Sequence, residues 1–235
     1  MSLTKLKQEL NFLKNKEKAK NYSRFFKTGK GEYGEGDVFL GIKVPVQRQI
    51  AKKYSTLSLA DLENLLSSKI HEYRLTALLI LVEKYQKSPE KEQKQIFNLY
   101  LKNTKYINNW DLVDLSAPKI VGTYLLTHQN RKILYQLAHS RNLWEKRIAV
   151  LATLSFIKEG QFSDSLKISQ ILLHDNHDLI HKAVGWMLRE VGKKDLKKEE
   201  EFLNKHYQTM PRTMLRYAIE KFPEAKRKFY LKKSR

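Results

Sequence analysis

Apolar residues recur at three- and four-residue spacing from one end of the chain to the other, and the alternation typical of strands is scarce. Side chains at this spacing share one face of a helix, whereas a half-buried strand needs apolar residues at alternate positions. The first such stripe, with lysines on the other faces of its helix, consists of Leu3, Leu6, Leu10 and Leu13. The pattern predicts an all-α protein whose helices are each about three or four turns long.

Capping residues and prolines indicate where the predicted helices begin. Ser58, followed three residues later by Asp61, is typical of a capping box, in which each side chain binds the backbone N–H of the other. Pro118 follows Ser116 closely, and because proline is tolerated in a first helical turn, we expect it to start a helix rather than break one. Ser88-Pro89-Glu90 is typical of a cap with proline in the first helical turn. Further helix boundaries are expected at Ser163-Asp164, Pro211 and Pro223.

The segment 29–36 differs from the rest, because it holds four of the nine glycines and must form a loop. A phosphate-binding loop of the nucleotide-hydrolase type needs Gly-Lys-Ser/Thr at the entry to a helix. Here Lys30 is followed by Gly31, so the required hydroxyl is missing. We interpret the segment as a connector that joins the first helix to the rest of the chain.

The interior of the chain repeats. Three helical segments align so that Arg147, Lys182 and Arg216 correspond, at spacings of 35 and 34 residues. Earlier units fall at Trp110 and at residues 73–77. A period of this length, with two helices per unit and no strands, predicts an α-solenoid of HEAT-like helical repeats. Tetratricopeptide repeats share the period, but their Trp-Leu-Gly-Tyr signature is absent.

We therefore expect one curved, single-domain array over residues 1–235. Equivalent positions in successive repeats line the same face, so Arg147, Lys182 and Arg216 would form a row of cations along a basic concave surface. The alternative is that each is an ordinary solvated charge on an exposed helix. The expected parts are an N-terminal basic helical segment (1–27), a Gly-rich loop (28–45), helical repeats (46–222) and a basic C-terminal segment (223–235).

Charge points to the class of partner. Lys and Arg number 45 against 25 Asp and Glu, a net charge of +20, which no isolated tail explains. A surface this basic attracts polyanions, meaning DNA, RNA or an anionic membrane. Charge kept only for solubility is the alternative, but such an excess is usually smaller and better mixed.

The chain contains no cysteine, which excludes disulfide frameworks, thiolate catalysis and zinc fingers. The longest uncharged run of its strongly apolar part, residues 75–82, is far shorter than a membrane-spanning helix, and residues 1–5 show no signal-peptide core. We expect a cytoplasmic protein without membrane insertion.

The stretch 107–115 combines an aromatic residue with carboxylates. Asn108 or Asn109 is a plausible helix cap, which puts Trp110, Asp111 and Asp114 in the first two helical turns. Trp110 and Asp114 are four residues apart and share a face of the helix. The alternative is structural: a tryptophan in the core, Asp111 complementing the helix dipole, and Asp114 in an internal salt bridge.

A second tryptophan favours a functional interpretation. Trp186 lies two repeats downstream, and Gly185 before it removes a side chain where close approach is needed. Two tryptophans and a carboxylate on the concave face would suit a cationic ligand or transition state, since aromatic faces attract cations.

The histidines are less informative. Their spacing, with His174, His177 and His181 near Asp175 and Asp178, could suggest metal ligation, but it also suits an ordinary polar turn and helix cap. We expect no metal and no cofactor. No Gly-x-Ser-x-Gly elbow and no dinucleotide fingerprint occurs in the sequence, so serine hydrolases and redox enzymes are not indicated.

Four stretches resemble one family, the AlkD-like DNA alkylation repair proteins, which are alkylpurine DNA glycosylases built from HEAT-like repeats. The resemblance covers roughly residues 22–222. Its most specific pieces, in the family's order, are residues 31–42 (GEYGEGDVFLGI) followed by Val44-Pro45, residues 110–114 (WDLVD), residues 144–147 (WEKR) and residues 182–190 (KAVGWMLRE).

The resemblance implies excision of N3- or N7-alkylated purines from duplex DNA, with the lesion held from the backbone side and the base left largely in the duplex. Trp110, Asp114 and Trp186 match the catalytic aromatics and carboxylate of the family, and Arg147 matches its phosphate-contacting arginine. We expect further DNA contacts from Phe25, Lys182, Arg189 and Arg216. The sequence departs from some members at Asn109, where an additional aromatic can occur, and at Phe25, where a tyrosine can occur.

The implied chemistry is coherent. Alkylation at N3 or N7 makes the purine cationic, so the base leaves neutral and needs no general acid. Asp114 would stabilise an oxocarbenium-like sugar and accept the proton of a water, while Trp110 and Trp186 shield the sugar. The leading hypothesis is a monofunctional, monomeric glycosylase. The alternatives are a non-catalytic module that binds damaged or structured nucleic acid and a protein-binding scaffold.

Overall fold

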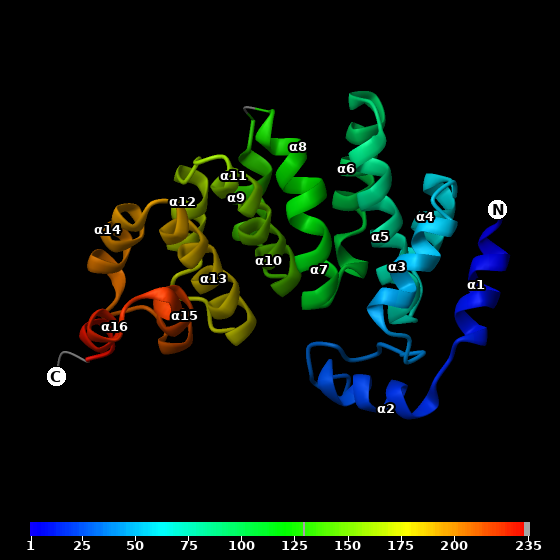
Figure 1. The fold of residues 1–235 in the computed structure, drawn as a ribbon, viewed down its shortest axis with the longest axis horizontal. Helices are drawn as coiled ribbons and strands as arrows, with labels where there is room; N and C mark the ends of the chain where they lie inside the picture. The colour runs from blue at the N-terminus through cyan, green and yellow to red at the C-terminus, as the bar shows by residue number, and fades with distance from the viewer. Residues whose placement is uncertain (129, 233–235) are drawn as a thin grey trace. The chain divides into compact units, whose positions relative to one another are not determined.

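The computed structural model describes residues 1–128 and 130–232, and it confirms the prediction of an all-α protein (Figure 1). The only β-type pairing among the described residues is one isolated bridge between Val38 and Ile70. No helix in the described part of the chain has both the length and the apolar character needed to cross a membrane. The chain divides into two compact units, Met1–Ser116 and Ala117–Arg235, and each is described by itself.

The first unit is built around one long buried helix, α5 (His71–Lys87), which packs against its neighbours α3, α4 and α6. Nearly every side chain from His71 to Val82 is buried, so α5 forms the core of this unit. Its other elements are α1 (Leu3–Phe12), α2 (Lys16–Phe25), α3 (Val44–Lys53), α4 (Leu59–Leu66), α6 (Glu90–Lys102), the 3-10 turn η1 (Thr104–Tyr106) and α7 (Trp110–Ala117).

The second unit is built around α13 (Asp178–Lys194), which packs against α10 (Leu143–Ala152), α14 (Leu196–His206) and α15 (Arg212–Ala218). Its remaining elements are the π-helical segment η2 (Pro118–Gly122), α8 (Thr123–Leu126), α9 (Lys132–Ala138), α11 (Leu154–Lys158), α12 (Ser163–Ile171), the 3-10 turn η3 (Ile219–Lys221) and α16 (Glu224–Leu231). The aligned residues Arg147, Lys182 and Arg216 lie on α10, α13 and α15, so the repeat alignment selected three helices that are neighbours within this unit.

Most of the predicted helix boundaries are confirmed. Ser58 and Asp61 form the capping box at the start of α4. Pro211 and Pro223 directly precede α15 and α16. In the first helix, Leu6 and Leu10 are fully buried, whereas Leu13 follows the helix and is 39% exposed.

Two boundaries differ from the prediction in detail. Pro118 does not open an independent helix; it begins η2, which follows α7 directly. Pro89, rather than Ser88, holds the position before α6, so the proline stands outside the first turn. The helix start predicted at Ser163 is confirmed, and the residue before it, Phe162, provides no side-chain cap.

The glycine-rich segment is a loop, as predicted, but it is folded on the first unit rather than acting as a simple connector. The Gly34 N–H donates to the Lys27 carbonyl at 2.9 Å, and a Cβ at Gly34 would lie 2.4 Å from the carbonyl oxygen of Phe26. Only glycine permits this close approach. The loop thereby delivers the buried side chains of Asp37 and Phe39 to the start of α5.

Candidate functional site

The start of α7 carries the carboxylates predicted from the sequence. The carbonyl of Asn109 accepts the N–H of Val113 at 3.1 Å, and its side-chain oxygen accepts the N–H of Trp110 at 2.9 Å, so Asn109 is the residue that begins the helix. Trp110, Asp111 and Asp114 follow, and all three are half-buried. The predicted placement of these residues in the first two turns is confirmed.

Phenylalanines at the end of α2 hold the ring of Trp110. Phe26 stacks on Trp110 with ring centroids 5.3 Å apart and planes 19° apart, and Phe25 meets the same ring edge-on at 5.9 Å. Phe26 also stacks on Phe39 at 5.0 Å. Each such pair adds roughly 0.5–1.5 kcal/mol beyond burial. The structure thus brings together two of the predicted site residues, Phe25 and Trp110.

Asp111 is held by a buried polar network. His71 Nε2 lies 2.8 Å from Asp111 Oδ2, and His71 Nδ1 lies 3.2 Å from Asp37 Oδ2. Arg74 Nη2 donates to the same Asp37 oxygen at 2.5 Å. Because each ring nitrogen of His71 faces a carboxylate, the imidazolium form satisfies both contacts with N–H donors.

Electrostatics agree with this protonation state. Burial by itself lowers the pKa of His71, but the charge of Asp111 and the hydrogen bonds to Asp111 and Asp37 outweigh burial and raise it. Burial raises the pKa of Asp37, but the hydrogen bonds from His71 and Arg74 outweigh burial and lower it. The network therefore compensates the charge of Asp111 with a cationic histidine.

Asp114 lies one turn beyond Trp110 on α7. Burial raises the pKa of Tyr100, a hydrogen bond with Ser116 at 2.9 Å opposes the shift, and the negative charge of Asp114 adds to it. The Tyr100 hydroxyl is thus neutral beside the Asp114 carboxylate. Of the two carboxylates at the start of α7, Asp111 is the one whose charge is balanced by His71.

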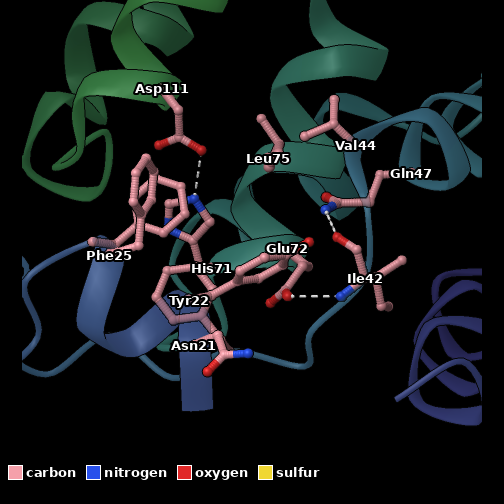
Figure 2. Close-up of a pocket in the computed structure, with 12 residues that line it drawn as sticks. Asn21, Tyr22, Phe25, Ile42, Val44, Gln47, His71, Glu72, Leu75 and Asp111 are labelled. Carbon is pink, nitrogen blue, oxygen red and sulfur yellow. Dashed lines mark hydrogen bonds and ion pairs between the residues drawn. The ribbon is translucent and has the colours of Figure 1, made fainter. Parts of the chain in front are cut away.

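A cavity of about 550 Å³ opens beside these residues, within the first unit (Figure 2). Its floor is buried and includes Gln47, His71 and Leu75, whereas its rim includes the exposed residues Phe25 and Val44. In Figure 2, Phe25 and Gln47 lie on opposite sides of the cavity.

Glu72 shapes the wall of this cavity. Its carboxylate is 1% exposed and accepts the backbone N–H groups of Leu40, Gly41 and Ile42 at 2.8, 2.7 and 3.2 Å. Three N–H donors satisfy a buried carboxylate without a cation. Glu72 therefore fixes the segment that runs from the loop into α3.

In the second unit, three predicted site residues share one face of α13. Lys182, Trp186 and Arg189 are spaced by four and three residues. Trp186 is half-buried and donates from Nε1 to Glu190 at 3.1 Å. Lys182 pairs with Asp178 at 2.6 Å, and Arg189 pairs with Glu220 of η3.

The remaining predicted DNA contacts differ in exposure. Arg216 is exposed on α15, but Arg147 is only 5% exposed, and its guanidinium donates to the Leu179 carbonyl. The expected row of solvent-facing cations is therefore interrupted at Arg147. A DNA contact by Arg147 stays a prediction.

The close approach expected at Gly185 is observed. A Cβ there would lie 2.4 Å from the carbonyl oxygen of Met214 and 2.5 Å from Cβ of Tyr217. The close approach at this glycine is that of α15 in the same unit. Helix packing therefore accounts for this glycine.

The histidine-rich stretch forms the ordinary turn and cap. Asp175 Oδ1 accepts the N–H of His177 at 2.8 Å, and His177 Nδ1 caps α13 by accepting the N–H of Leu179 at 3.1 Å. No cluster of three or more potential metal-ligating side chains occurs in residues 1–128 and 130–232.

Comparison with known proteins identifies the family. Residues 6–222 match the family described as DNA alkylation repair enzyme. The chain belongs to this family. None of the curated proteins matches it.

Two solved structures resemble this member of the DNA alkylation repair enzyme family. One, described as a predicted DNA alkylation repair enzyme from Enterococcus faecalis, has a TM-score of 0.71 and 20% identity, over 90% of this chain and 97% of that one. The other, smu.31 from Streptococcus mutans UA159, has a TM-score of 0.54 and 18% identity, over 76% of this chain and 92% of that one. At such identities, the likeness establishes the all-helical fold.

Sequence reasoning missed the buried polar network that contacts Asp111 at the start of α7. Asp37, His71 and Glu72 were not selected, because each lies in or beside a segment that was interpreted as a loop or as core. One signal was available: charged residues stand at the start of α5, directly before its apolar run. Charged side chains that close to a buried helix need partners.

Proposed function

We propose that this DNA alkylation repair enzyme is a monofunctional glycosylase that hydrolyses the N-glycosidic bond of cationic N3- or N7-alkylated purines in duplex DNA. The observation that carries the proposal is the position of Asp114 one turn beyond Trp110 on α7, where Phe25 and Phe26 hold the Trp110 ring. Asp111, the other carboxylate at the start of α7, is paired with His71 at 2.8 Å.

Asp114 is the carboxylate suited to the chemistry. As the bond between C1′ and the purine nitrogen breaks, its electron pair neutralises the cationic base, and positive charge develops on the sugar. The Asp114 carboxylate stabilises that charge, and it accepts the proton of the water whose oxygen bonds to C1′. No general acid is needed, because the base leaves neutral.

Trp110 is suited to face the sugar. Its ring is fixed by Phe25 and Phe26, and a rigid aromatic face attracts a developing cation without loss of side-chain entropy during the reaction. Trp186, on α13, is assigned the same role from the sequence resemblance. DNA contacts are assigned to Phe25, Lys182, Arg189, Arg216 and Arg147 on the same basis and on charge.

Release of methylated base from alkylated duplex DNA tests the proposal. The Asp114→Asn variant should lose at least about 100-fold in single-turnover rate, since it removes the charge that stabilises the transition state. Asp111→Asn is the matched control; we expect a smaller loss, because the charge that it removes is already compensated by His71.

Equal rates for wild type and Asp114→Asn would remove Asp114 from the mechanism. Absence of release by the wild type, together with tight binding to the same duplex, would favour the non-catalytic nucleic-acid module instead.

A further inference from the structure

The imidazole of His71 is held firmly at the start of α5. Its side chain is 2% exposed, and its ring stacks on Phe39 with centroids 4.5 Å apart. Phe26 lies against the same ring at 5.1 Å. Because α5 forms the packed core of the first unit, a group that pairs with this imidazole is attached to a part of the unit that moves little.

The two ring nitrogens of His71 differ in what depends on them. Asp37 lies 3.2 Å from Nδ1, but it also accepts from Arg74 Nη2 at 2.5 Å. Asp111 Oδ2 lies 2.8 Å from Nε2, and no other side chain in the described part of the chain pairs with this carboxylate. Loss of the Nδ1 donor would leave Asp37 with its arginine. Loss of the Nε2 donor would leave Asp111 without a side-chain partner.

The Nε2 bond joins α5 to the start of α7 across 40 residues of sequence (Figure 2). Trp110 directly precedes Asp111, and its ring rests on Phe26 with the planes 19° apart. Stacked rings accept a range of offsets, whereas a hydrogen bond needs a narrow range of distance and angle. The bond to Asp111 therefore fixes how the first turn of α7, which carries Trp110, sits against α5.

We propose that His71 is a positioning residue, whose Nε2–H holds Asp111 and so sets the orientation of Trp110 and the place of Asp114 one turn further on. The positioning concerns the protein alone. Its effect on the rate of base release rests on the proposed function. A displacement of reacting groups by about 1 Å slows a reaction roughly 100-fold, so a bond that fixes the first turn of α7 affects the rate without a contact to the substrate.

Two substitutions separate the two ring nitrogens. The amide nitrogen of glutamine stands as far along the side chain as Nε2 of histidine, and the amide nitrogen of asparagine stands as far along as Nδ1. His71→Gln therefore keeps a donor for Asp111, whereas His71→Asn keeps a donor for Asp37 instead. Both variants lose the ring and its charge, so a role in stability alone predicts similar effects.

Fluorine NMR of the full chain labelled with fluorotryptophan reports on Trp110 without DNA. Its resonance is assigned with Trp110→Phe. We expect one sharp Trp110 line in the wild type and in His71→Gln, and a broadened or split line in His71→Asn, because the ring then takes several orientations. His139→Gln, which changes an exposed histidine of the second unit, should give the wild-type spectrum.

The rate of base release from alkylated duplex DNA gives a second measurement. His71→Asn should lower the single-turnover rate about 10–100-fold, and His71→Gln by less than about threefold. The Kd for the duplex should change by less than about twofold in both variants, since a positioning residue affects the rate and not the binding.

Asp111 provides a second pair of variants in case His71→Asn fails to fold. Its side chain is 16% exposed, so a substitution there disturbs the core less than one at His71 does. Asp111→Asn keeps an acceptor for the Nε2–H, and Asp111→Leu does not. We expect a sharp Trp110 line in Asp111→Asn and a broadened or split line in Asp111→Leu.

The same Trp110 line shape in His71→Gln and His71→Asn, or in the two Asp111 variants, would overturn the proposal. If the wild type releases no base, the glycosylase hypothesis fails, but a difference in the Trp110 line between paired variants still supports the positioning. The two failures therefore give different results.

Discussion

At the scale of single residues, Glu199 is an unusual carboxyl group. It is 1% exposed where α14 packs against α13, and its Oε1 meets no hydrogen-bond donor in the described part of the chain. Its Oε2 lies 1.6 Å from the place that a Cβ on Gly192 would take, so glycine there makes room for it. Burial and the charge of Glu200 raise the pKa of Glu199 to about 8, although Arg189 and Lys226 oppose the shift.

Glu199 should make the protein less stable as the pH rises. The unfolded chain releases this proton near the ordinary pKa of 4.5 and the folded chain near 8, so the free energy of unfolding falls between these values by about 1.4 kcal/mol per pH unit and then levels off. Glu199→Gln should raise the free energy of unfolding by roughly 2–4 kcal/mol at pH 8. At pH 4.5 the substitution should leave the free energy of unfolding nearly unchanged. Urea denaturation at both pH values measures the difference.

Glu201→Gln is the control for this prediction. Glu201 is exposed on the same helix and pairs with Lys198 at 3.2 Å, so its substitution should change stability by less than about 0.5 kcal/mol at either pH. If the Glu199→Gln variant and the wild type were equally stable at every pH, the pKa of Glu199 would not be raised in the folded protein.

At the scale of helices, α13 depends on its contact with α15. Gly185→Ala would place a methyl group 2.4 Å from the Met214 carbonyl oxygen, so the two helices must separate. We expect a loss of about 1–3 kcal/mol in the free energy of unfolding, the usual effect of overpacking. Lys193→Ala, on an exposed position of α13, should lose less than about 0.5 kcal/mol. Similar thermal unfolding of the two variants would contradict the close packing.

Some helix boundaries follow from residues that are close together in the sequence. The capping box at Ser58 and the start of α7 after Asn109 follow from residues within four positions of one another, and both were predictable. The conformation at Pro118 was not predictable, because a proline can start a helix or continue one. In this protein Pro118 begins a π-helical segment directly after α7. Propensity alone does not choose between these.

At the scale of the whole molecule, the net charge of +20 dominates. Binding to duplex DNA should weaken steeply between about 50 and 200 mM salt, because each phosphate contact releases a counterion. Lys182→Ala should reduce the slope of log Kd against log salt by about one. Fluorescence anisotropy over this salt range measures both. An affinity that barely responds to salt would instead support the protein-binding scaffold.

The sequence by itself determined the fold class, the net charge of +20 and the place of the carboxylates at the start of α7. Apolar periodicity, net charge and helix caps depend on composition or on near neighbours, so they can be read without coordinates. A resemblance to DNA alkylation repair proteins was also visible in four short motifs, and the match over residues 6–222 confirms that broader family.

Only the tertiary structure decided which polar groups are paired. His71 meets Asp37 and Asp111 across 34 and 40 residues of sequence, and Gln47 faces the cavity because α3 packs on α5. Arg147 is buried, although its repeat partner Arg216 is exposed. Pairing and burial depend on which distant segments come into contact. A periodic apolar pattern predicts that one face of a helix is buried, but it does not identify the segment that buries it.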